Sequence, residues 1–509
     1  MNANFSNKCI TNFKPLLISG LICTSLANAS EKKPNIIFIL ADDWGWTDWQ
    51  MNGDKFGSTF YETPNLNKLA SQGVYFSQAY ATPLSSPSRA ALLTGKYPGA
   101  RLHMHQAITG ASKPNPILPE SARPNLKTCF PESSSHLALE EITIAEELQK
   151  AGYTNSQFGK WHLGNEPFFP KHQGFDSQFA VGGAGPGPSY FAPFARLSDI
   201  AQGYKDEYIT ERLTDEVCNR LEQVKNKSFF IYLAHFNVHS PYQAKADLVA
   251  KYTAKSNPNN PHHHPVMAAM IESLDASVGK VMDKLTELGL DKNTLVIVMG
   301  DNGGVHWNND KSPKYKDMPV TSNQPLRAGK CCFYEGGVRV PLIIRFPKMI
   351  KTGRVENTPV HLVDFYPTLL QLAKTKASKE KDVLDGLSIL PLLSGKGKIP
   401  KRPIFCHFPR AAQIGAEVGG SSIRLGNYKL YRLYGANADA TDSYELYNLA
   451  NDIGETKDVS NELPEICKKM KAELNSWLIN TKALIPHKNP AWDINSVKKQ
   501  GIEGENDTE

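Results

Sequence analysis

Asn35-Ile36-Ile37-Phe38-Ile39-Leu40-Ala41-Asp42-Asp43 is a short, almost continuous run of apolar residues that ends in two aspartates. The run does not alternate between apolar and polar residues. Such runs are typical of strands that are buried on both faces, as in a parallel sheet covered by helices. We therefore expect a central strand over residues 35–41, with Asp42 and Asp43 at its carboxyl end.

Three further apolar runs, over residues 229–234, 294–299 and 340–346, have the same character. The run at 294–299 leads into Gly300-Asp301-Asn302, a second polar pair at the end of an expected strand. The run at 340–346 carries a proline near its start. We expect a strand in each of the three.

Helical patterns lie between these strands. Thr143-Ile144-Ala145-Glu146 has the residues of a capping box, which opens a helix. Other apolar residues recur in steps of three and four, as on one face of a long helix: Ile271, Leu274, Val278, Val281 and Leu285. Strands that alternate with helices predict an α/β fold with a mostly parallel central sheet flanked by helices. Ligands bind such sheets at the carboxyl ends of the strands.

The pattern changes toward the C-terminus. Residues 422–431 and 444–449 are typical of short paired strands, and residues 463–479 of an amphipathic helix. We expect a smaller C-terminal α+β subdomain over residues 401–490, made of antiparallel strands and a helix. Residues 491–509 then form a polar tail.

The N-terminus has the features of an export signal over residues 1–29. Two lysines precede the apolar stretch 16–26, and Ala27-Asn28-Ala29 is a typical cleavage site. Cys23 leaves a lipid anchor as the alternative, although the residue before it is not small. We expect the chain to be exported and cleaved after Ala29.

The charge of the chain is mildly positive. Cleavage of the signal removes two lysines and lowers the net charge from +6 to +4. This balance suits an anionic substrate, but the sequence has no basic tract that would favour nucleic acid or a membrane surface. Beyond the signal we expect no membrane span and no nucleic-acid partner.

Six cysteines remain after cleavage, and their spacing matches no zinc site. An exported protein can form disulfides, so we expect one or two, with the other cysteines as buried thiols. The six are Cys129, Cys218, Cys331, Cys332, Cys406 and Cys467.

Ser85-Ser86-Pro87-Ser88-Arg89-Ala90-Ala91-Leu92-Leu93-Thr94-Gly95 predicts a helix that begins near Ser85. Proline is favourable in the first turn of a helix, where its missing N–H would have no partner. Ser85 then lies at the helix N-terminus, where free N–H groups and the dipole attract an anion. Arg89 adds a positive charge one turn later. A serine in this position is by itself most often only a cap.

This stretch resembles the signature of the type I sulfatases, which belong to the alkaline phosphatase superfamily. The resemblance extends over nearly the whole mature chain. It implies an alkaline phosphatase-like fold and a reaction that hydrolyses sulfate esters. It also implies that Ser85 is oxidised to formylglycine by a radical maturase before export, and that the protein works in the periplasm or outside a bacterial cell.

The resemblance assigns a metal site to the two polar pairs. Asp42, Asp43, Asp301 and Asn302 match the family's metal ligands, with modified Ser85 as a further ligand. All donors are oxygen atoms, and a site without thiolate or imidazole suits one Ca²⁺ rather than Zn²⁺. An isolated Asp-Asp or Asn-Gly pair is commonly just a turn, but here both pairs end buried strands.

The resemblance also assigns the residues that act on sulfate. Lys160-Trp161-His162-Leu163-Gly164 is similar to the family's second signature, in which Lys160 contacts sulfate and His162 takes a proton from the hydrated aldehyde. His239 corresponds to the histidine that protonates the leaving alcohol. Lys330 corresponds to the lysine that holds sulfate from the other side, and Arg89 helps to neutralise it.

The implied mechanism follows from these parts. One hydroxyl of the hydrated formylglycine attacks sulfur while His239 acts as general acid for the departing sugar oxygen. Loss of the second hydroxyl's proton to His162 then regenerates the aldehyde and releases sulfate. Residues 30–400 form the catalytic domain in this interpretation, and the partners are a sulfated carbohydrate, the maturase and the export machinery.

Loops above the strand ends are expected to select the sugar. The candidates are His103 and His105, the segment 113–135, and the segment 182–194, in which Tyr190 and Phe191 are candidates for stacking on a sugar. Several arylsulfatase-A-like enzymes of polysaccharide-degrading bacteria act on 4-sulfated galactose or N-acetylgalactosamine. By analogy we favour such a substrate.

Two alternatives remain open. The first is a phosphatase or phosphonate monoesterase of the same superfamily that uses unmodified Ser85, although the sequence offers no second set of zinc ligands. The second is a non-catalytic protein that binds sulfated glycans. His262-His263-His264 lies between two prolines, and we interpret it as a loop rather than another metal site.

Overall fold

The computed structural model describes residues 32–50, 58–108, 126–182, 185–351, 353–378, 383–410 and 418–492. The predicted signal peptide over residues 1–29 lies outside these residues, as does nearly all of the predicted tail. Part of the segment 113–135 lies outside them too.

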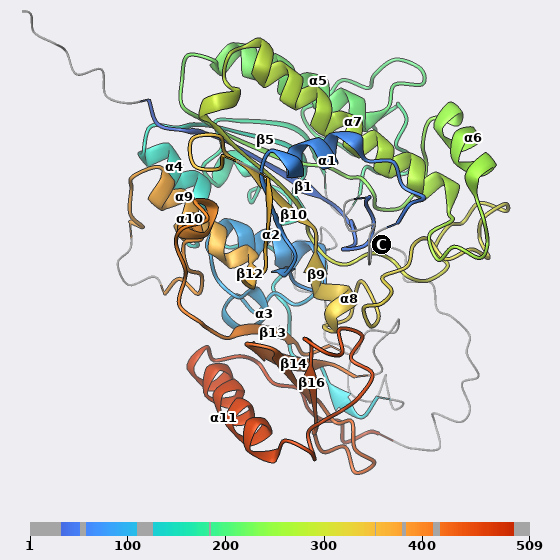
Figure 1. Ribbon diagram of the computed structural model, residues 1–509, viewed down its shortest axis with the longest axis vertical. Helices are drawn as coiled ribbons and strands as arrows, with labels where there is room; N and C mark the ends of the chain where they lie inside the picture. The colour runs from blue at the N-terminus through green and yellow to red at the C-terminus, as the bar shows by residue number, and fades with distance from the viewer. Residues whose placement is uncertain are drawn as a thin grey trace, which may run out of the picture. The chain divides into compact units, whose positions relative to one another are not determined.

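The centre of the larger part of the chain is a sheet in the order β11-β2-β10-β8-β1-β7-β5-β6 (Figure 1). β8, β1, β7, β5 and β6 run parallel to one another, as do β11 and β2. In this described sheet only β10 is antiparallel to the strands on both of its sides, β2 and β8. The predicted mostly parallel sheet is therefore confirmed. The strands are β1 (Asn35–Ala41), β2 (Val74–Phe76), β5 (Thr154–Lys160), β6 (Ser177–Gly182), β7 (Phe229–Ala234), β8 (Thr294–Gly300), β10 (Leu342–Arg345) and β11 (Arg354–Glu356).

Strand β1 shows why an unbroken apolar run forms a central strand. Ile36 and Phe38 contact one hydrophobic cluster, which includes residues of α2, α4 and α9. Ile37 and Ile39 contact another, which includes residues of α1, α5 and α7. Both faces of the sheet are thus covered by helices, as Figure 1 shows. The six helices are α1 (Pro64–Ser71), α2 (Ser85–Thr94), α4 (Ile144–Lys150), α5 (Ile209–Val224), α7 (Pro265–Glu287) and α9 (Phe365–Leu372).

Local signals placed two of these helices correctly. The side chain of Thr143 accepts a hydrogen bond from the N–H of Glu146 at 3.2 Å, and Glu146 accepts one from the N–H of Thr143 at 2.7 Å. This is the predicted capping box of α4. Helix α7 contains all five apolar residues of the predicted stripe, and each of them is buried.

The strand expected over residues 340–346 is divided in the structure. β9 (Arg339–Val340) pairs with β3 (Ala79–Tyr80) in a separate sheet, whereas β10 joins the central sheet. Pro341 lies between them and has no N–H to donate to a ladder, which explains the break. The predicted strand is therefore confirmed over residues 342–345, whereas its predicted start at residue 340 is wrong.

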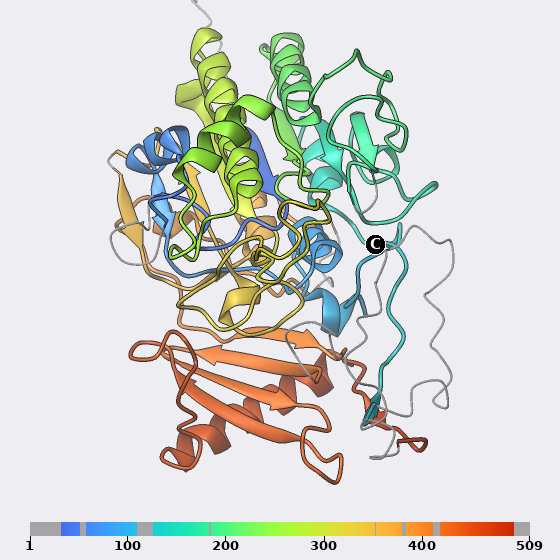
Figure 2. The same cartoon turned by 90° about the vertical axis from the view of Figure 1, so that its right-hand side faces the viewer.

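The smaller C-terminal region is an antiparallel sheet in the order β13-β14-β15-β16, which α11 covers (Figure 2). Ile423 of β14, Leu430 of β15 and Leu474 of α11 belong to the hydrophobic cluster that also contains Phe38 of β1. The C-terminal α+β region predicted from the sequence is therefore present, and its core is continuous with that of the main sheet. Its elements are β13 (Ile404–Phe408), β14 (Gly420–Leu425), β15 (Tyr428–Leu433), β16 (Ser443–Asn448) and α11 (Pro464–Asn480).

The remaining elements are short connections and edges. They are α3 (Pro98–Arg101), α6 (Ala246–Lys255), α8 (Glu335–Val338), α10 (Leu390–Leu393), β4 (Thr128–Cys129), β12 (Val360–His361), β17 (His487–Lys488), and the 3₁₀ turns Pro170–His172, Asp291–Asn293 and Leu362–Asp364. Among the described residues, no helix combines the length and apolar character that crossing a bilayer requires.

No disulfide links any two of the six cysteines that the structure describes, so the expectation of one or two bridges is wrong. Four of the six lie in four different elements: Cys129 in β4, Cys218 in α5, Cys406 in β13 and Cys467 in α11.

A buried ion pair joins the C-terminal sheet to α8. Lys429 of β15 lies 2.7 Å from the carboxylate of Glu335 in α8, and Arg339 lies 3.4 Å from it. Burial alone would raise the pKa of Glu335, but Lys429 and Arg339 outweigh it and lower the pKa to about 2. This carboxylate therefore stabilises the fold above its unfolded pKa, and the contribution is lost as the pH falls toward 2.

Replacing Lys429 with methionine is expected to lower the free energy of unfolding by about 3 kcal/mol, because Glu335 keeps its buried charge and loses its nearest cation. Urea unfolding measures the loss. The control is Lys457→Met, which removes an ion pair of the same 2.7 Å length between side chains that are 67% and 56% exposed. It should cost less than about 1 kcal/mol. Equal losses in both variants would contradict the structural role of the buried pair.

Candidate active site

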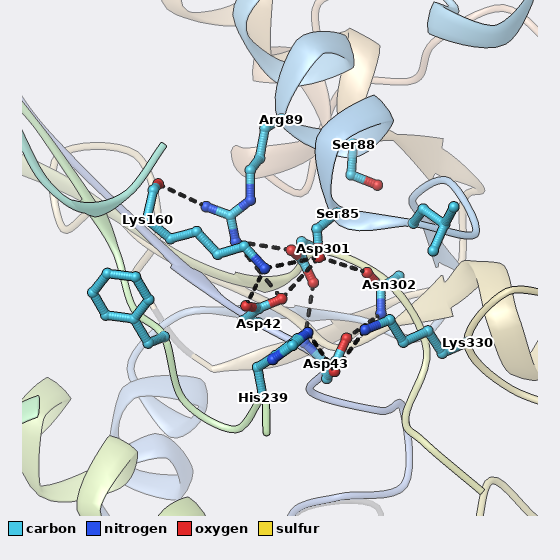
Figure 3. A network of polar contacts seen from close by, with 12 residues as sticks. Asp42, Asp43, Ser85, Ser88, Arg89, Lys160, His239, Asp301, Asn302 and Lys330 are labelled. Carbon is cyan, nitrogen blue, oxygen red and sulfur yellow. Dashed lines mark hydrogen bonds and ion pairs between the residues drawn. The ribbon is translucent and has the colours of Figure 1, made fainter. Parts of the chain in front are cut away.

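Adjacent parallel strands bring polar residues to one edge of the central sheet. Asp42-Asp43 follows β1, Asp301-Asn302 follows β8, and Lys160 is the last residue of β5. His239 lies five residues after the end of β7. Because β8, β1, β7 and β5 are consecutive in the sheet, their carboxyl ends place these side chains around one point (Figure 3).

The carboxylates of Asp42, Asp43 and Asp301 form a compact group. Each offers an oxygen atom that lies within 4.8 Å of those of the other two, and none of the three residues is more than 1% exposed. The N–H of Asp43 donates to Asp301 Oδ1 at 3.1 Å, and Asn302 Nδ2 donates to Asp43 Oδ1 at 2.7 Å. Buried carboxylates at this spacing need positive charge nearby.

Each carboxylate has a cation beside it. Lys160 Nζ lies 2.5 Å from Asp42 Oδ2, Arg89 Nη2 lies 2.9 Å from Asp301 Oδ2, and Lys330 Nζ lies 3.1 Å from Asp43 Oδ2. These side chains are themselves buried. The named carboxylates and cations therefore balance one another in charge.

The pKa values of the two aspartates Asp42 and Asp301 are shifted in opposite directions. Burial alone would raise the pKa of Asp42, but Lys160, His239 and Arg89 outweigh it and the pKa is lowered. Burial and the neighbouring charge of Asp42 raise the pKa of Asp301, despite Arg89 and Lys160. Burial disfavours the charged form of Lys160 too and so lowers its pKa, and the nearby charge of Asp42 offsets this only in part.

Ser85 lies where this group meets a helix. It is the first residue of α2, as the sequence predicts, and its Oγ lies 2.8 Å from Asp42 Oδ1 and 3.2 Å from Asn302 Oδ1. The one hydroxyl proton can serve only one of these acceptors at a time. Lys160 Nζ lies 3.4 Å from the same oxygen, so an anion at this point meets the helix N-terminus and a cation.

Arg89 and Ser88 fix the first turn of α2. Arg89 Nη1 donates to the carbonyl of Lys160 at 2.9 Å, so one guanidinium spans the ends of β5 and β8. Ser88 Oγ accepts a hydrogen bond from the N–H of Thr82 at 3.0 Å, in the segment that leads to the helix. Both contacts fix the turn that carries Ser85, and Figure 3 shows that of Arg89 with Lys160.

His239 faces the group through Nε2. This nitrogen lies 3.9 Å from Asp43 Oδ2, whereas Nδ1 lies 2.8 Å from the carbonyl oxygen of Ser240. A carbonyl oxygen can only accept, so Nδ1 carries a hydrogen and Nε2 is the nitrogen that exchanges a proton. The N–H of Asp42 donates to the carbonyl of Asn237 at 2.7 Å, which ties the His239 segment to β1.

Three further predicted site residues are His162, His103 and His105. His162 is buried two residues after Lys160, with its N–H 3.3 Å from the carbonyl of Gly182. His103 Nε2 lies 3.3 Å from the carbonyl of Lys482, and His105 Nε2 lies 3.2 Å from that of Pro131. Burial lowers the pKa of His105 to about 3. These bonds of His103 and His105 are to the protein itself rather than to the residues around Ser85.

Of the two roles open to Tyr190, a sugar contact and a structural one, burial favours the structural role, because the residue is 0% exposed. Phe191, the other candidate, packs against the ring of Tyr208 at 5.0 Å.

The histidine run does not converge on a point. His262 Nδ1 lies 3.6 Å from Asp48 Oδ1, His263 Nδ1 lies 2.6 Å from the carbonyl of Asn260, and His264 caps α7. Within the described ranges, Asp42, Asp43 and Asp301 are the one group of acidic, histidine or cysteine residues with metal-ligand spacing. The interpretation of the run as a loop is consistent with this.

Asn323 supports the site, and sequence reasoning missed it. Its Nδ2 donates to the carbonyl of Gly304 at 2.9 Å, and its Oδ1 accepts from the N–H of Gly304 at 3.2 Å. The N–H of Lys330 donates to the same carbonyl at 3.1 Å. Asn323 thereby joins the loop after Asp301-Asn302 to the loop that carries Lys330. No local pattern marks an asparagine for such a role.

Comparisons with known proteins agree with this geometry. Residues 34–375 match the family described as Sulfatase, and residues 328–480 match the family described as N-sulphoglucosamine sulphohydrolase, C-terminal. A sulfatase of Formosa agariphila is 32% identical over 92% of this chain and 93% of its own. The N-acetylgalactosamine-6-sulfatase of Mus musculus is 30% identical over 87% of this chain and 81% of its own.

Solved structures give the same result. The crystal structure of Ps i-CgsB in complex with k-i-k-neocarrahexaose is 29% identical and has a TM-score of 0.71, over 91% of this chain and 96% of that one. The family match covers more than half of the chain and includes every residue drawn around Ser85. The chain therefore belongs to the sulfatase family, has its alkaline phosphatase-like fold and is a sulfuric ester hydrolase.

Proposed function

We propose that this sulfatase removes O-sulfate from sulfated carbohydrates, that it uses a formylglycine formed from Ser85 and one Ca²⁺, and that it does so after export to the periplasm or cell exterior. The observation that carries the proposal is the position of Ser85 Oγ. It lies within 3.4 Å of Asp42, Asn302 and Lys160, in a buried group of alternating charges.

The residues fit a calcium ion. Asp42, Asp43 and Asp301 offer carboxylate oxygens within 4.8 Å of one another, and Asn302 Oδ1 faces the same side as Ser85 Oγ. Such hard oxygen donors suit Ca²⁺, which when bound would stabilise negative charge on the reacting oxygens. The three carboxylates are already balanced by two lysines and an arginine, so an incoming sulfate ester, with one negative charge, would offset half of the charge that Ca²⁺ adds.

The cations fit a sulfate group. Lys160 approaches Ser85 from β5, Arg89 from α2, and Lys330 from the loop before α8 (Figure 3). Because all three are buried and held by carboxylates, they would stabilise negative charge on the sulfuryl oxygens with little reorganisation. The aldehyde that replaces Ser85 would supply a route for release of the sulfate, which a serine sulfate lacks.

His239 is the proposed general acid. Its Nδ1–H is held by the carbonyl of Ser240, so Nε2 points toward Asp43 and can deliver a proton to the sugar oxygen that leaves. A sugar alkoxide is a poor leaving group, and this proton is therefore worth about 10²–10⁴-fold in rate. His162 is the proposed base for the last proton transfer.

A galacto-configured sugar is the proposed substrate, and 4-sulfated galactose or N-acetylgalactosamine is the form we favour. Two findings support the sugar class. One relative is named for N-acetylgalactosamine, and the Ps i-CgsB structure was solved with a k-i-k-neocarrahexaose. His103 and His105 remain proposed sugar contacts from a neighbouring loop.

The mass of the tryptic peptide Leu69–Arg89 tests the modification. In protein from the native host, the peptide is expected to be two hydrogens lighter than its serine form, or to appear as the hydrate of that aldehyde. An unmodified serine in protein that hydrolyses sulfate would contradict the proposed chemistry. An unmodified serine with phosphatase activity would favour the first alternative instead.

A panel of sulfated sugars tests the substrate. The modified protein is expected to release sulfate from 4-sulfated galactose or N-acetylgalactosamine. N-acetylgalactosamine 6-sulfate and glucosamine 6-sulfate are the comparison compounds. Turnover of glucosamine 6-sulfate without turnover of the 4-sulfated galactosides would contradict the favoured substrate. Tight binding to sulfated glycans without release of sulfate would favour the non-catalytic alternative.

A further inference from the structure

Tyr190 contacts the backbone that carries the proposed general acid. Its hydroxyl lies 2.5 Å from the carbonyl oxygen of Phe236 and 2.8 Å from that of His239. The ring is wholly buried and stacks against Tyr208 at 5.8 Å. Burial raises the pKa of Tyr190 well above its ordinary value, so the phenol remains a donor wherever the enzyme works.

The same part of the chain holds the other end of the His239 segment. The N–H of Tyr190 donates to Gln243 Oε1 at 2.9 Å, and Ser189 Oγ donates to the same oxygen at 3.0 Å. Tyr208 OH donates to the carbonyl of Gln243 at 3.0 Å. Residues 236–243 are thus fixed at both ends, by Tyr190 OH at Phe236 and His239 and by three donors at Gln243.

His239 depends on this support because it lies beyond the end of β7. The ring is oriented by the carbonyl of Ser240, which belongs to the same segment. On the opposite side, the N–H of Val238 donates to the carbonyl of Asp42 at 2.5 Å. The segment is therefore held between β1 and Tyr190, and a shift of either support moves Nε2 relative to Ser85.

We propose that Tyr190 is a positioning residue that holds His239 in the geometry for proton transfer to the leaving sugar oxygen. The inference rests on the proposed role of His239. Without the Tyr190 hydroxyl, the carbonyls of Phe236 and His239 lose the one proton that they share. The Phe236 carbonyl keeps the N–H of His239 at 2.9 Å, but that bond lies within the segment, which is then free to relax away from Tyr190. Small misplacements of a proton donor cost about 10–10²-fold in rate, so the cost should appear in kcat rather than in KM.

Two substrates with different leaving groups can distinguish a positioning role of Tyr190 from a general loss of structure. A sugar alkoxide needs a proton as it departs, whereas 4-nitrophenolate leaves without one. Tyr190→Phe is therefore expected to lower kcat for a sulfated sugar by about 10–10²-fold, with KM and the rate on 4-nitrophenyl sulfate changed less than about threefold.

Tyr153→Phe is the matched control. The hydroxyl of Tyr153 is also buried and donates to one backbone carbonyl, that of Pro34, at 2.9 Å, but it precedes β5 at the opposite end of the sheet. It should lower the melting temperature comparably and leave kcat unchanged. An unchanged kcat for the sugar in Tyr190→Phe would overturn the inference. So would equal losses of kcat on the sugar and on the aryl ester.

His239→Ala distinguishes failure of the inference from failure of its premise. If His239 is the acid, this variant loses sugar-sulfate turnover and keeps most of its rate on the aryl ester. If it keeps sugar turnover, the proposed role of His239 is wrong. If it behaves as expected and Tyr190→Phe does not, the positioning role alone is wrong. If the wild type does not hydrolyse the aryl ester, the two tyrosine variants are compared on the sulfated sugar alone. A kcat that is lower in Tyr190→Phe than in Tyr153→Phe supports the positioning role, and equal values contradict it.

Discussion

Replacing Ser85 with alanine is expected to lower kcat/KM for a sulfated sugar by at least about 10⁴-fold, to the level of residual electrostatic catalysis. Alanine cannot be converted to formylglycine, and it removes the oxygen that lies 2.8 Å from Asp42 Oδ1. The cations around the site remain, so the variant should still bind the substrate. Steady-state kinetics and calorimetric titration of substrate measure the two quantities separately.

Ser86→Ala provides the control for this substitution. Ser86 is the next residue of α2 and is also buried, but its Oγ accepts a hydrogen bond from the N–H of Ile108 at 3.0 Å. Its loss leaves one buried N–H without that acceptor, which should cost about 1–3 kcal/mol of stability and little activity. A Ser85→Ala protein with even a tenth of the wild-type rate would show that the reaction does not proceed through residue 85.

The central strands could be predicted because burial on both faces leaves a continuous apolar run. β1 and β7 begin and end where the sequence indicates. β5 was missed, since its sequence Thr-Asn-Ser-Gln-Phe-Gly-Lys is polar although nearly all of it is buried. Asn155 shows how: its Nδ2 donates to the carbonyls of Ala145 and Gly174. Partners so far along the chain leave no local pattern.

In the candidate site, too, some residues could be predicted from the local sequence and others could not. The aspartates after β1 and β8 could be placed from the sequence, because strand ends and acidic pairs are local features. Lys160 and Lys330 were placed only by resemblance, and the structure now brings both within 3.1 Å of a carboxylate. The sequence left Tyr190 open between a sugar contact and a structural role, since an aromatic residue in a glycine- and proline-rich loop looks the same whether it faces a sugar or the core.

Removing calcium is expected to abolish activity while leaving the protein folded. Asp42, Asp43 and Asp301 each keep a cation within 3.1 Å, so the chelated protein has no uncompensated cluster of negative charge. Returning Ca²⁺ to 100 times its dissociation constant should raise the free energy of unfolding by about 2.7 kcal/mol. Thermal unfolding with EGTA and with added Ca²⁺ measures this independently of turnover.

Asp43→Asn tests whether the stabilisation comes from the proposed site. The substitution keeps the size of the side chain but removes the charge beside Lys330 and Asn302. A site with fewer charged ligands binds the metal more weakly. The calcium-dependent shift should therefore vanish at the same concentration. Asp215→Asn is the control, because it removes an equal charge from an exposed position on α5, where the shift should persist. A shift that survives Asp43→Asn would place the calcium elsewhere, and activity that survives chelation would show that the buried lysines and arginine suffice to stabilise the sulfate.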